Sequence, residues 1–318
     1  PATRRHFVFT IYKSIESEII ILDKIEKGAW VNIVNPNEKE ISCLSEDLKI
    51  PIEHLKAALD EEERARIELD EECTIVLIDI PVASKDTSER GIYYTIPLGI
   101  IITNENIVTV SLRENSVIRP FLENKVKSFW TFKKTRFLLQ IFYRNSKVYL
   151  QYLRNIDKTS DVIESRLHRS LKNEELIQLL ELEKSLVYFS TSLKSNEIVL
   201  EKIQRANLIK MYPDDMELLE DVIIENKQAI EMSNIYSNIL SGTMDAYASV
   251  ISNNLNMVLK FLTSVTIIIS IPTMVASFFG MNVHVPFEND AHAFMIIFMI
   301  SILFSVILSV FMVRKELF

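Results

Sequence analysis

The chain has 318 residues, of which 25% are charged, and its formal net charge at pH 7 is -8. A net negative charge argues against a nucleic-acid partner and is compatible with divalent cations as partners. The mean hydropathy of +0.15 is high for so acidic a protein. The apolar residues must therefore be concentrated in one part of the chain.

Residues 1–118 predict an α+β or α/β domain. Strands are indicated by five stretches that are rich in β-branched and aromatic residues: HFVFTIYK, AWVNIVN, TIVLIDIP, IYYTIPLGIIIT and NIVTVSLR. Asn104-Glu105-Asn106 predicts a hairpin turn between the last two. Residues 37–69, between the second and third stretches, are predicted to be helical, so the domain contains both strands and helices.

We expect this first domain to lie in the cytoplasm. The opening stretch PATRRHFVFTIYK has no long apolar region followed by a cleavage site, so it does not predict a signal peptide. The two cysteines, Cys43 and Cys73, lack the spacing of a zinc site and indicate a reducing compartment without a disulfide framework.

Residues 119–212 predict two long amphipathic helices, which we expect to pack as an antiparallel pair with a turn at Lys172-Asn173. A stalk helix is then predicted over residues 213–260. It starts at Pro213-Asp214-Asp215, where a carboxylate can cap free amides. Because the helical pattern continues into the first apolar run, the whole helix from residue 214 to residue 279 would be about 100 Å long.

Two apolar runs near the C-terminus, residues 261–283 and 293–313, contain no charged residue. Each is long enough to cross a bilayer as a helix. Lys260 precedes the first run, and Arg314 and Lys315 follow the second. The outer loop 284–292 contains the acids Glu288 and Asp290 but no lysine or arginine. The positive-inside rule therefore places both ends of the chain in the cytoplasm. Residues 293–318 are then predicted to form the second span of the plasma (inner) membrane and a short cytoplasmic tail.

Four hydroxyl residues of the first run recur at spacings of four, three and four, which places them on one helix face: Thr266, Ser270, Thr273 and Ser277. The same stripe continues toward the cytoplasm through Leu262, Leu259 and Asn256. Such hydroxyls can favour close helix packing or bond to their own carbonyls. Alternatively, they line a wet pore that the leucines constrict. Two helices cannot enclose a pore, so that interpretation requires a homo-oligomer.

Gly280-Met281-Asn282 ends the same helix. An ordinary helix C-cap would explain the glycine and the asparagine. In an oligomer, the asparagine side chains and helix-end carbonyls would instead form a ring of uncharged oxygen acceptors. Because Mg²⁺ gives up its water reluctantly, such a ring could hydrogen-bond the hydrated ion and let it pass.

These features together resemble the CorA-type divalent-cation transport proteins. The resemblance depends on the GMN tripeptide after Pro272-Thr273, placed between two terminal apolar runs and after a long helix. It implies a funnel-shaped homopentamer in the lipid bilayer that conducts Mg²⁺, and in many members Co²⁺ and Ni²⁺, without an organic cofactor. Gly280, Met281 and Asn282 would form the selectivity ring, with the stripe from Asn256 to Ser277 lining the pore.

The resemblance also implies that intracellular Mg²⁺ closes the pore by binding between neighbouring cytoplasmic domains. Asp221 matches a stalk aspartate that binds this regulatory ion. Its partner acid lies in the first domain, where the candidates are Glu68, Asp70, Glu71, Glu72 and Asp79.

Three alternatives stay open. The first is a zinc transporter of the same superfamily, and the second is a membrane-anchored sensor or scaffold that conducts nothing. An enzyme is the least favoured, because the 5 histidines are scattered and no phosphate-binding loop or nucleophile elbow is present in the sequence.

Overall fold

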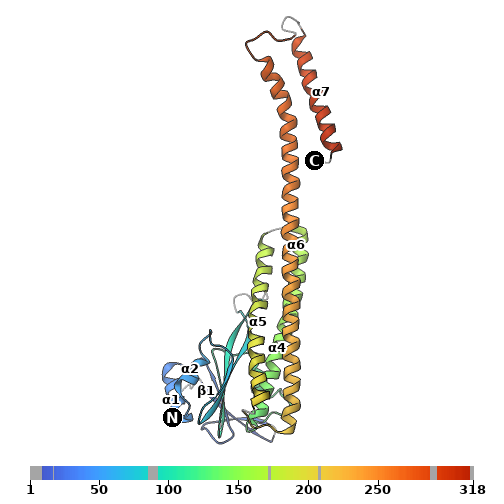
Figure 1. Ribbon diagram of the computed structural model, residues 1–318. Helices are drawn as coiled ribbons and strands as arrows, with labels where there is room; N and C mark the ends of the chain where they lie inside the picture. Colours follow the sequence, from blue (N-terminus) through green and yellow to red (C-terminus); the bar gives the residue numbers. More distant parts are fainter. Residues whose placement is uncertain are drawn as a thin grey trace. The chain divides into compact units, whose positions relative to one another are not determined.

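The computed structural model describes residues 9–16, 18–84, 92–170, 173–206, 209–286 and 292–315. The chain divides into two compact units, Pro1–Gly242 and Thr243–Phe318. The first unit contains a sheet with helices on both faces, and the second contains two apolar helical segments (Figure 1). One helix, α6 (Pro213–Phe279), belongs partly to each unit.

A seven-stranded mixed sheet organises the first unit. Its strands are β1 (Phe9–Ile15), β2 (Glu18–Leu22), β3 (Trp30–Val34), β4 (Arg66–Leu69), β5 (Cys73–Ala83), β6 (Tyr93–Thr103) and β7 (Ile107–Ser111). They lie in the order β2-β1-β3-β7-β6-β5-β4, and only the β3–β7 pair is parallel. The predicted turn at residues 104–106 is confirmed, because β6 and β7 pair as an antiparallel hairpin.

The segment predicted to be helical over residues 37–69 is helical only in its first part. It forms α1 (Glu38–Leu48) and α2 (Ile52–Ala57), and Asn37 caps α1 by accepting hydrogen bonds from the amides of Lys39 and Glu40. The prediction is wrong at β4, an edge strand that pairs with β5. The pairing partner and the burial of Ile67 outweigh the helical propensity of its neighbours.

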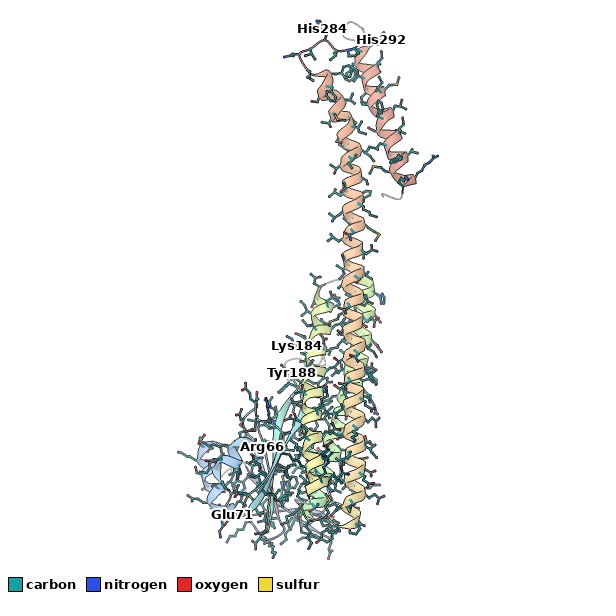
Figure 2. The ribbon with its side chains drawn as sticks, viewed as in Figure 1. Arg66, Glu71, Lys184, Tyr188, His284 and His292 are labelled. Atoms are coloured by element: carbon teal, nitrogen blue, oxygen red, sulfur yellow. The ribbon has the colours of Figure 1, made fainter. Side chains whose placement is uncertain are left out.

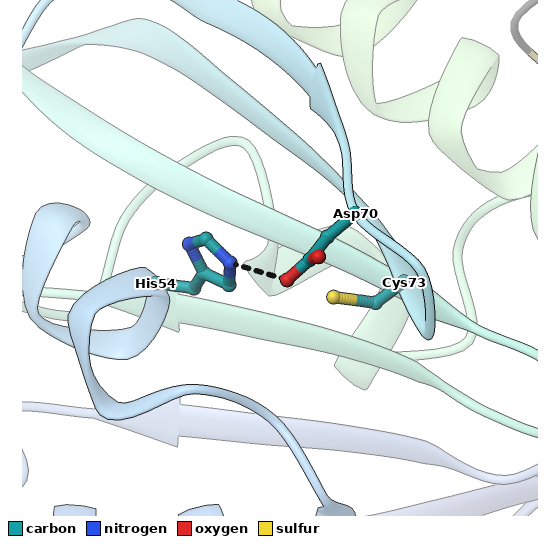
Figure 3. A group of neighbouring side chains, drawn as sticks. All are labelled: His54, Asp70 and Cys73. Carbon is teal, nitrogen blue, oxygen red and sulfur yellow. Dashed lines mark hydrogen bonds and ion pairs between the residues drawn. The ribbon is translucent and has the colours of Figure 1, made fainter.

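A tight turn joins β4 to β5 and brings two polar side chains close together. The amide of Asp70 donates to the carbonyl of Cys73 at 2.9 Å, which closes the turn. In Figure 2, the labels of Arg66 and Glu71 mark the strand and the turn. Figure 3 shows the side chains of Asp70 and Cys73 at close range. Strand β2 is a second element that the sequence did not predict.

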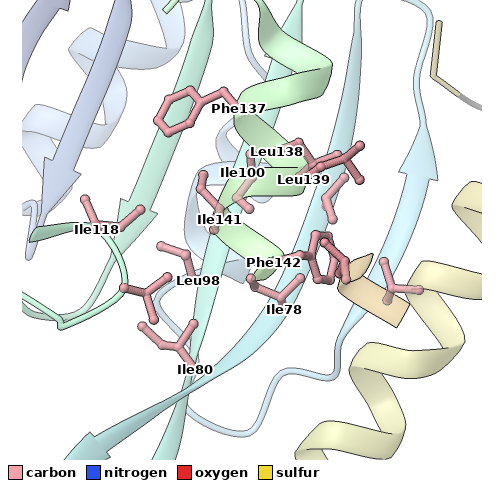
Figure 4. Packing of buried hydrophobic residues seen from close by; sticks show 14 of the residues in the cluster. Ile78, Ile80, Leu98, Ile100, Ile118, Phe137, Leu138, Leu139, Ile141 and Phe142 are labelled. Atoms are coloured by element: carbon pink, nitrogen blue, oxygen red, sulfur yellow. The ribbon is translucent and has the colours of Figure 1, made fainter. Parts of the chain in front are cut away.

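The sheet buries a hydrophobic core on each face. One core lies between the sheet and α1 and α2, and includes Leu44, Leu55 and Val110. The other lies against α4 (Lys134–Ser170), where side chains of β5 and β6 meet Phe137 and Phe142 (Figure 4). Because both faces are covered, the inner strands are almost continuously apolar.

Helices α4 and α5 (Asn173–Ala206) pack antiparallel, as predicted. The rings of Tyr149 and Phe189 meet at 5.0 Å between centroids, and Asn145 and Asn196 both donate to the carbonyl of Asp79. Tyr149 thus lies beside Phe189, and the earlier residue Asn145 lies beside the later residue Asn196. This order shows that the two helices run in opposite directions. The predicted turn at Lys172-Asn173 lies partly outside the described residues.

The first part of α6 runs parallel to α4. Ion pairs join Arg136 to Asp215 and Lys147 to Glu225, so the residue numbers rise together on the two helices. The helix begins at Pro213, as predicted, and the carboxylate of Asp215 accepts a hydrogen bond from the amide of Tyr212 at 3.2 Å. That carboxylate satisfies an amide at the helix start.

The second unit consists of the rest of α6 and α7 (Ala293–Arg314). Both helices are long and apolar enough to cross a membrane. Pro272 lies within α6 and does not end it. The first predicted span, residues 261–283, is helical only as far as Phe279, and residues 280–283 lie beyond the helix. Helix α7 begins at the residue where the second apolar run starts.

A close contact between the sheet and α2 predicts the effect of one substitution. A Cβ added to Gly99 on β6 would lie 2.6 Å from the Cβ of Ala58. We expect Gly99→Ala to lower the stability of the first unit by about 1–3 kcal/mol, the usual cost of overpacking. Trp30 and Trp130 are the 2 tryptophans and both lie in this unit, so thermal unfolding of the full chain followed by tryptophan fluorescence measures the effect.

The control is Gly242→Ala, because nothing lies within 4 Å of a Cβ added at that position in α6. This substitution is expected to be neutral or to stabilise the chain by up to about 1 kcal/mol, since alanine is the better helix former. Equal unfolding midpoints for the two variants would contradict the close approach of α2 to β6.

Candidate ion pathway and metal-binding residues

The seven residues of the predicted stripe all lie on α6, and all are exposed in the single chain. At 100° per residue, the four hydroxyl residues fall within about 60° of one another around the helix. Leu259 is 49% exposed and Leu262 is 59% exposed. The side of α6 that carries the stripe is therefore not covered by the chain's own residues.

A different side of α6 is covered. The least exposed positions in the second unit's part of this helix include Ser264, Ile268, Ile271 and Val275. Their mean direction lies roughly 160° from that of the hydroxyl stripe. On α7 the buried residues are Ser301 and Met312. Packing within one chain thus uses the face opposite the stripe, and does not account for the stripe.

Three of the stripe's hydroxyls bond to their own helix. Thr266 Oγ1 donates to the carbonyl of Leu262 at 2.8 Å, Ser270 Oγ donates to Ile267 at 2.8 Å, and Thr273 Oγ1 donates to Ile269 at 3.3 Å. These bonds satisfy the donors, whereas each hydroxyl oxygen can still accept hydrogen bonds. The stripe therefore presents oxygen acceptors to whatever lies beside it, which suits water or a hydrated cation.

Helix α6 ends at the residue before Gly280. The amide of Gly280 still donates to the carbonyl of Ala276 at 3.0 Å. Among the described residues, the left-handed glycine is Gly28, not Gly280. The glycine therefore does not end the helix through the left-handed conformation that usually favours it there. Met281 and Asn282 follow, and both are exposed.

The link after this tripeptide is described only in part. His284 and His292 lie near its two ends, where Figure 2 labels them. The predicted outer acids Glu288 and Asp290 lie outside the described residues.

The proposed regulatory acids lie in different surroundings. Asp221 is exposed on α6, within the first unit. Glu68 pairs with Arg66 at 2.7 Å, and Asp70 bonds to His54 at 3.1 Å. Both carboxylates are thus already engaged within the domain.

Glu71 and Glu72 are exposed and line a cavity of about 900 Å³. Asp214 and Asp215, at the start of α6, line the same cavity. The structure thus brings acids of the β4–β5 turn close to acids of α6. Asp221 lies two turns further along α6 and on the same side as Asp214, because seven residues complete nearly two turns.

Asp79 differs from the other candidates because it is largely buried between the sheet and the long helices. Its carbonyl accepts hydrogen bonds from Asn145, Tyr149 and Asn196. Burial raises the pKa of its carboxyl group to about 6, although a hydrogen bond from Ser192 partly offsets this. A carboxylate held in the interior is poorly placed to share an ion with a second subunit.

The sequence did not predict a further group, of three side chains with the atom types that ligate metals. Atoms that can bind a metal on His54, Asp70 and Cys73 all lie within 4.8 Å of one another (Figure 3). The hydrogen bond from His54 lowers the pKa of the Asp70 carboxyl, and the amide of Glu71 adds to this. Burial raises the pKa of the Cys73 thiol, with the carboxylates of Asp70 and Glu72 adding to the effect.

Comparison with known proteins identifies the family. The family model described as "CorA-like Mg2+ transporter protein" matches residues 26–315. The chain belongs to this family. The resemblance stated from the GMN tripeptide and its surroundings is thereby confirmed.

The relatives that this CorA-like chain matches align with most of its length. The "Cobalt/magnesium transport protein CorA" of Methanocaldococcus jannaschii is 28% identical over 273 residues, which cover 84% of each chain. The solved structure of the complete CorA magnesium transporter from the same organism has a TM-score of 0.83 at 26% identity, and covers 96% of this chain and 98% of that one.

A likeness to a second protein, ZntB, is more remote. The cytoplasmic domain of ZntB from Vibrio parahaemolyticus has a TM-score of 0.58 at 12% identity, with 77% of this chain and 96% of that one covered. At that identity, the comparison shows the fold alone.

The buried carboxyl of Asp79 predicts a pH dependence of stability. Because its folded-state pKa is raised from 3.8 to about 6, the folded state holds the proton more tightly than the unfolded state. Its contribution to stability is complete below about pH 4 and is lost as the pH rises through 6. Asp79→Asn should therefore stabilise the first unit at pH 7.5 by up to about 3 kcal/mol, at 1.36 kcal/mol per pKa unit.

The gain should shrink toward pH 4.5, which tryptophan fluorescence during thermal unfolding of the full chain can measure at both pH values. Glu46→Gln, which neutralises an exposed acid on α1, serves as the control and should change little. An asparagine variant less stable than the parent at pH 7.5 would contradict the burial cost assigned to Asp79.

Proposed function

We propose that this chain assembles as a homopentamer in the plasma (inner) membrane and conducts Mg²⁺, and also Co²⁺ and Ni²⁺. The observation that carries the proposal is the family match over residues 26–315. The name of the Methanocaldococcus relative, a cobalt/magnesium transport protein, supports the choice of cations. A transporter family also supports the expectation that the chain is not an enzyme.

The pore is proposed to run along the hydroxyl stripe of α6. Residues 261–283 and 293–318 would form a transmembrane hairpin, with both ends of the chain in the cytoplasm. The covered face of α6, with Ser264 and Ile271, would pack against α7, while the stripe on the opposite side faces the pentamer axis. Two properties support this: the exposure of the stripe and its separation from the covered face.

Two levels of the pore would have different roles. Rings of Leu259 and Leu262 would form an apolar constriction that blocks ions when it loses its water. At the outer end, rings of Gly280 and Asn282 would present carbonyl and amide oxygens. The exposure of Asn282, and a glycine without a left-handed conformation, support a functional role for this tripeptide beyond ending the helix.

Intracellular Mg²⁺ is proposed to hold the pore closed by bridging the first units of neighbouring subunits. Asp221 would supply one carboxylate, and Glu71 or Glu72 the other. Their exposure supports this assignment over Asp79, and over Glu68 and Asp70, which have partners within the domain. A ligand shifts an equilibrium only by its difference in affinity for the two states, and an ion shared between subunits supplies that difference.

Two alternatives make different predictions for transport. A zinc transporter would prefer Zn²⁺ over Mg²⁺ in competition. The remote likeness to ZntB shows a shared fold and does not support a choice of ion. A non-conducting scaffold would show no flux. The exposed hydroxyl stripe argues against the scaffold, because a helix that only anchors a domain gains nothing from polar side chains facing lipid.

The first test measures the role of Asn282. Asn282→Ala removes the proposed ring of amide oxygens and should lower Mg²⁺ flux into proteoliposomes by at least about tenfold, equivalent to about 1.4 kcal/mol in the barrier. Val283→Ala is the control, since it changes the adjacent exposed residue. Unchanged flux in Asn282→Ala would refute the pore assignment, and preferential inhibition of Mg²⁺ flux by Zn²⁺ would favour the zinc transporter.

The second test measures regulation. In the parent protein, raising Mg²⁺ on the side of the first unit should suppress flux. Asp221→Asn should raise the concentration for half-suppression by about tenfold, the shift expected for about 1.4 kcal/mol of lost binding energy. Glu231→Gln neutralises another exposed acid of α6 and should suppress normally. Equal sensitivity of the two variants would remove Asp221 from the regulatory site.

A further inference from the structure

We infer that His54, Asp70 and Cys73 form a binding site for one first-row transition-metal ion, of the class of Co²⁺, Ni²⁺ and Zn²⁺, in the first unit. This site lies outside the proposed pore and does not include Asp221. It therefore goes beyond the proposed transport and regulation by Mg²⁺.

The three side chains are held in place by separate structural elements. Asp70 and Cys73 lie at the two ends of the turn between β4 and β5, and the hydrogen bond between their backbones fixes their separation. His54 lies on α2, which the buried side chain of Leu55 anchors to the core. The amide of Glu71 binds Asp70 Oδ1, and His54 Nε2 lies 3.1 Å from Asp70 Oδ2.

The distances fit a small tetrahedral ion. With metal–ligand bonds of about 2.0 Å, two ligand atoms of a tetrahedral site lie about 3.3 Å apart. The distance of 3.1 Å between His54 Nε2 and Asp70 Oδ2 is close to this value. All the ligand atoms, with Cys73 Sγ included, lie within 4.8 Å of one another, so a small movement of the thiol would complete the set. A fourth position is left for water.

The ligand types select the class of ion. Thiolate and imidazole suit Zn²⁺, Co²⁺ and Ni²⁺, whereas Mg²⁺ requires oxygen ligands in an octahedral arrangement. The site should therefore bind transition metals in the presence of excess Mg²⁺. This separates it from the exposed carboxylates of Glu71 and Glu72, which suit harder cations.

An ion can reach the cluster from solvent. Asp70 and Cys73 line the cavity of about 900 Å³, and Glu71 and Glu72 line it beside them. Acidic residues at the entrance raise the local concentration of cations. His54 is only partly covered, with 19% of its side chain exposed. The cysteine is therefore buried in the core and at the same time adjacent to an accessible acidic cavity.

The test uses the untagged full-length protein in detergent with a non-chelating reductant, titrated with Co²⁺ alone. A Co²⁺ ion bound by a thiolate gives a ligand-to-metal charge-transfer band in the near ultraviolet, which oxygen ligands do not. The chain has 2 cysteines, so the band can arise only from Cys43 or Cys73. We expect one equivalent of Co²⁺ per chain to produce it, with no loss in excess Mg²⁺.

Cys73→Ser should abolish the band, whereas Cys43→Ser, which removes the exposed thiol on α1, should keep it. His54→Gln alters a partly exposed side chain and should weaken Co²⁺ binding by at least about tenfold, a loss that even residues outside the ligand shell can produce. Its tryptophan unfolding midpoint without metal shows that the fold is retained.

Three outcomes would overturn the site: no thiolate band in the parent protein, a band that survives Cys73→Ser, or Co²⁺ binding that His54→Gln leaves unchanged. Displacement of Co²⁺ by a similar concentration of Mg²⁺ would overturn the selectivity. None of these outcomes depends on transport, so the site and the proposed channel can fail separately.

Discussion

A membrane helix that displays a row of oxygen atoms on one side needs a polar partner for that row. Hydrocarbon cannot supply one, and the second apolar helix of this chain does not, because the covered face of α6 lies opposite the hydroxyls. The three observed bonds to backbone carbonyls satisfy the hydroxyl protons and leave acceptor oxygens exposed. In the homopentamer proposed above, a water-filled axis shared by several copies of α6 would supply partners for all of these oxygens at once.

The first unit depends on a different constraint, the burial of both faces of its sheet. Helices α1 and α2 cover one face, while α4 and α5 cover the other. Because helices cover both faces of the sheet, the candidate metal-ligating side chains lie at its edge, beside the turn between β4 and β5. That edge gathers the exposed acids Glu71 and Glu72 and the cluster of His54, Asp70 and Cys73. The turn thus carries exposed carboxylates, Glu71 and Glu72, beside the buried thiol of Cys73.

The interior also contains a titratable group that has no role in the proposed transport. Asp79 lies where α4 and α5 meet β5, and the side chains of Asn145 and Asn196 bind its backbone from both helices. The backbone at this point is an attachment between sheet and helices, whereas the carboxyl group is costly to ionise there. Asp79 and Asp221 therefore lie in opposite surroundings, because the first is largely buried and the second is exposed on α6.

Local and periodic patterns were enough to predict the long helices and the start of α6, because helix periodicity is a property of neighbouring residues. The tertiary structure alone decided three other features. Strand β4 depends on pairing with β5. The burial of Asp79 depends on two helices more than sixty residues further along the chain. The cluster of His54, Asp70 and Cys73 depends on α2 lying beside the β4–β5 turn. Each requires residues distant in sequence to come together, and the energy of such contacts is not encoded in any short segment.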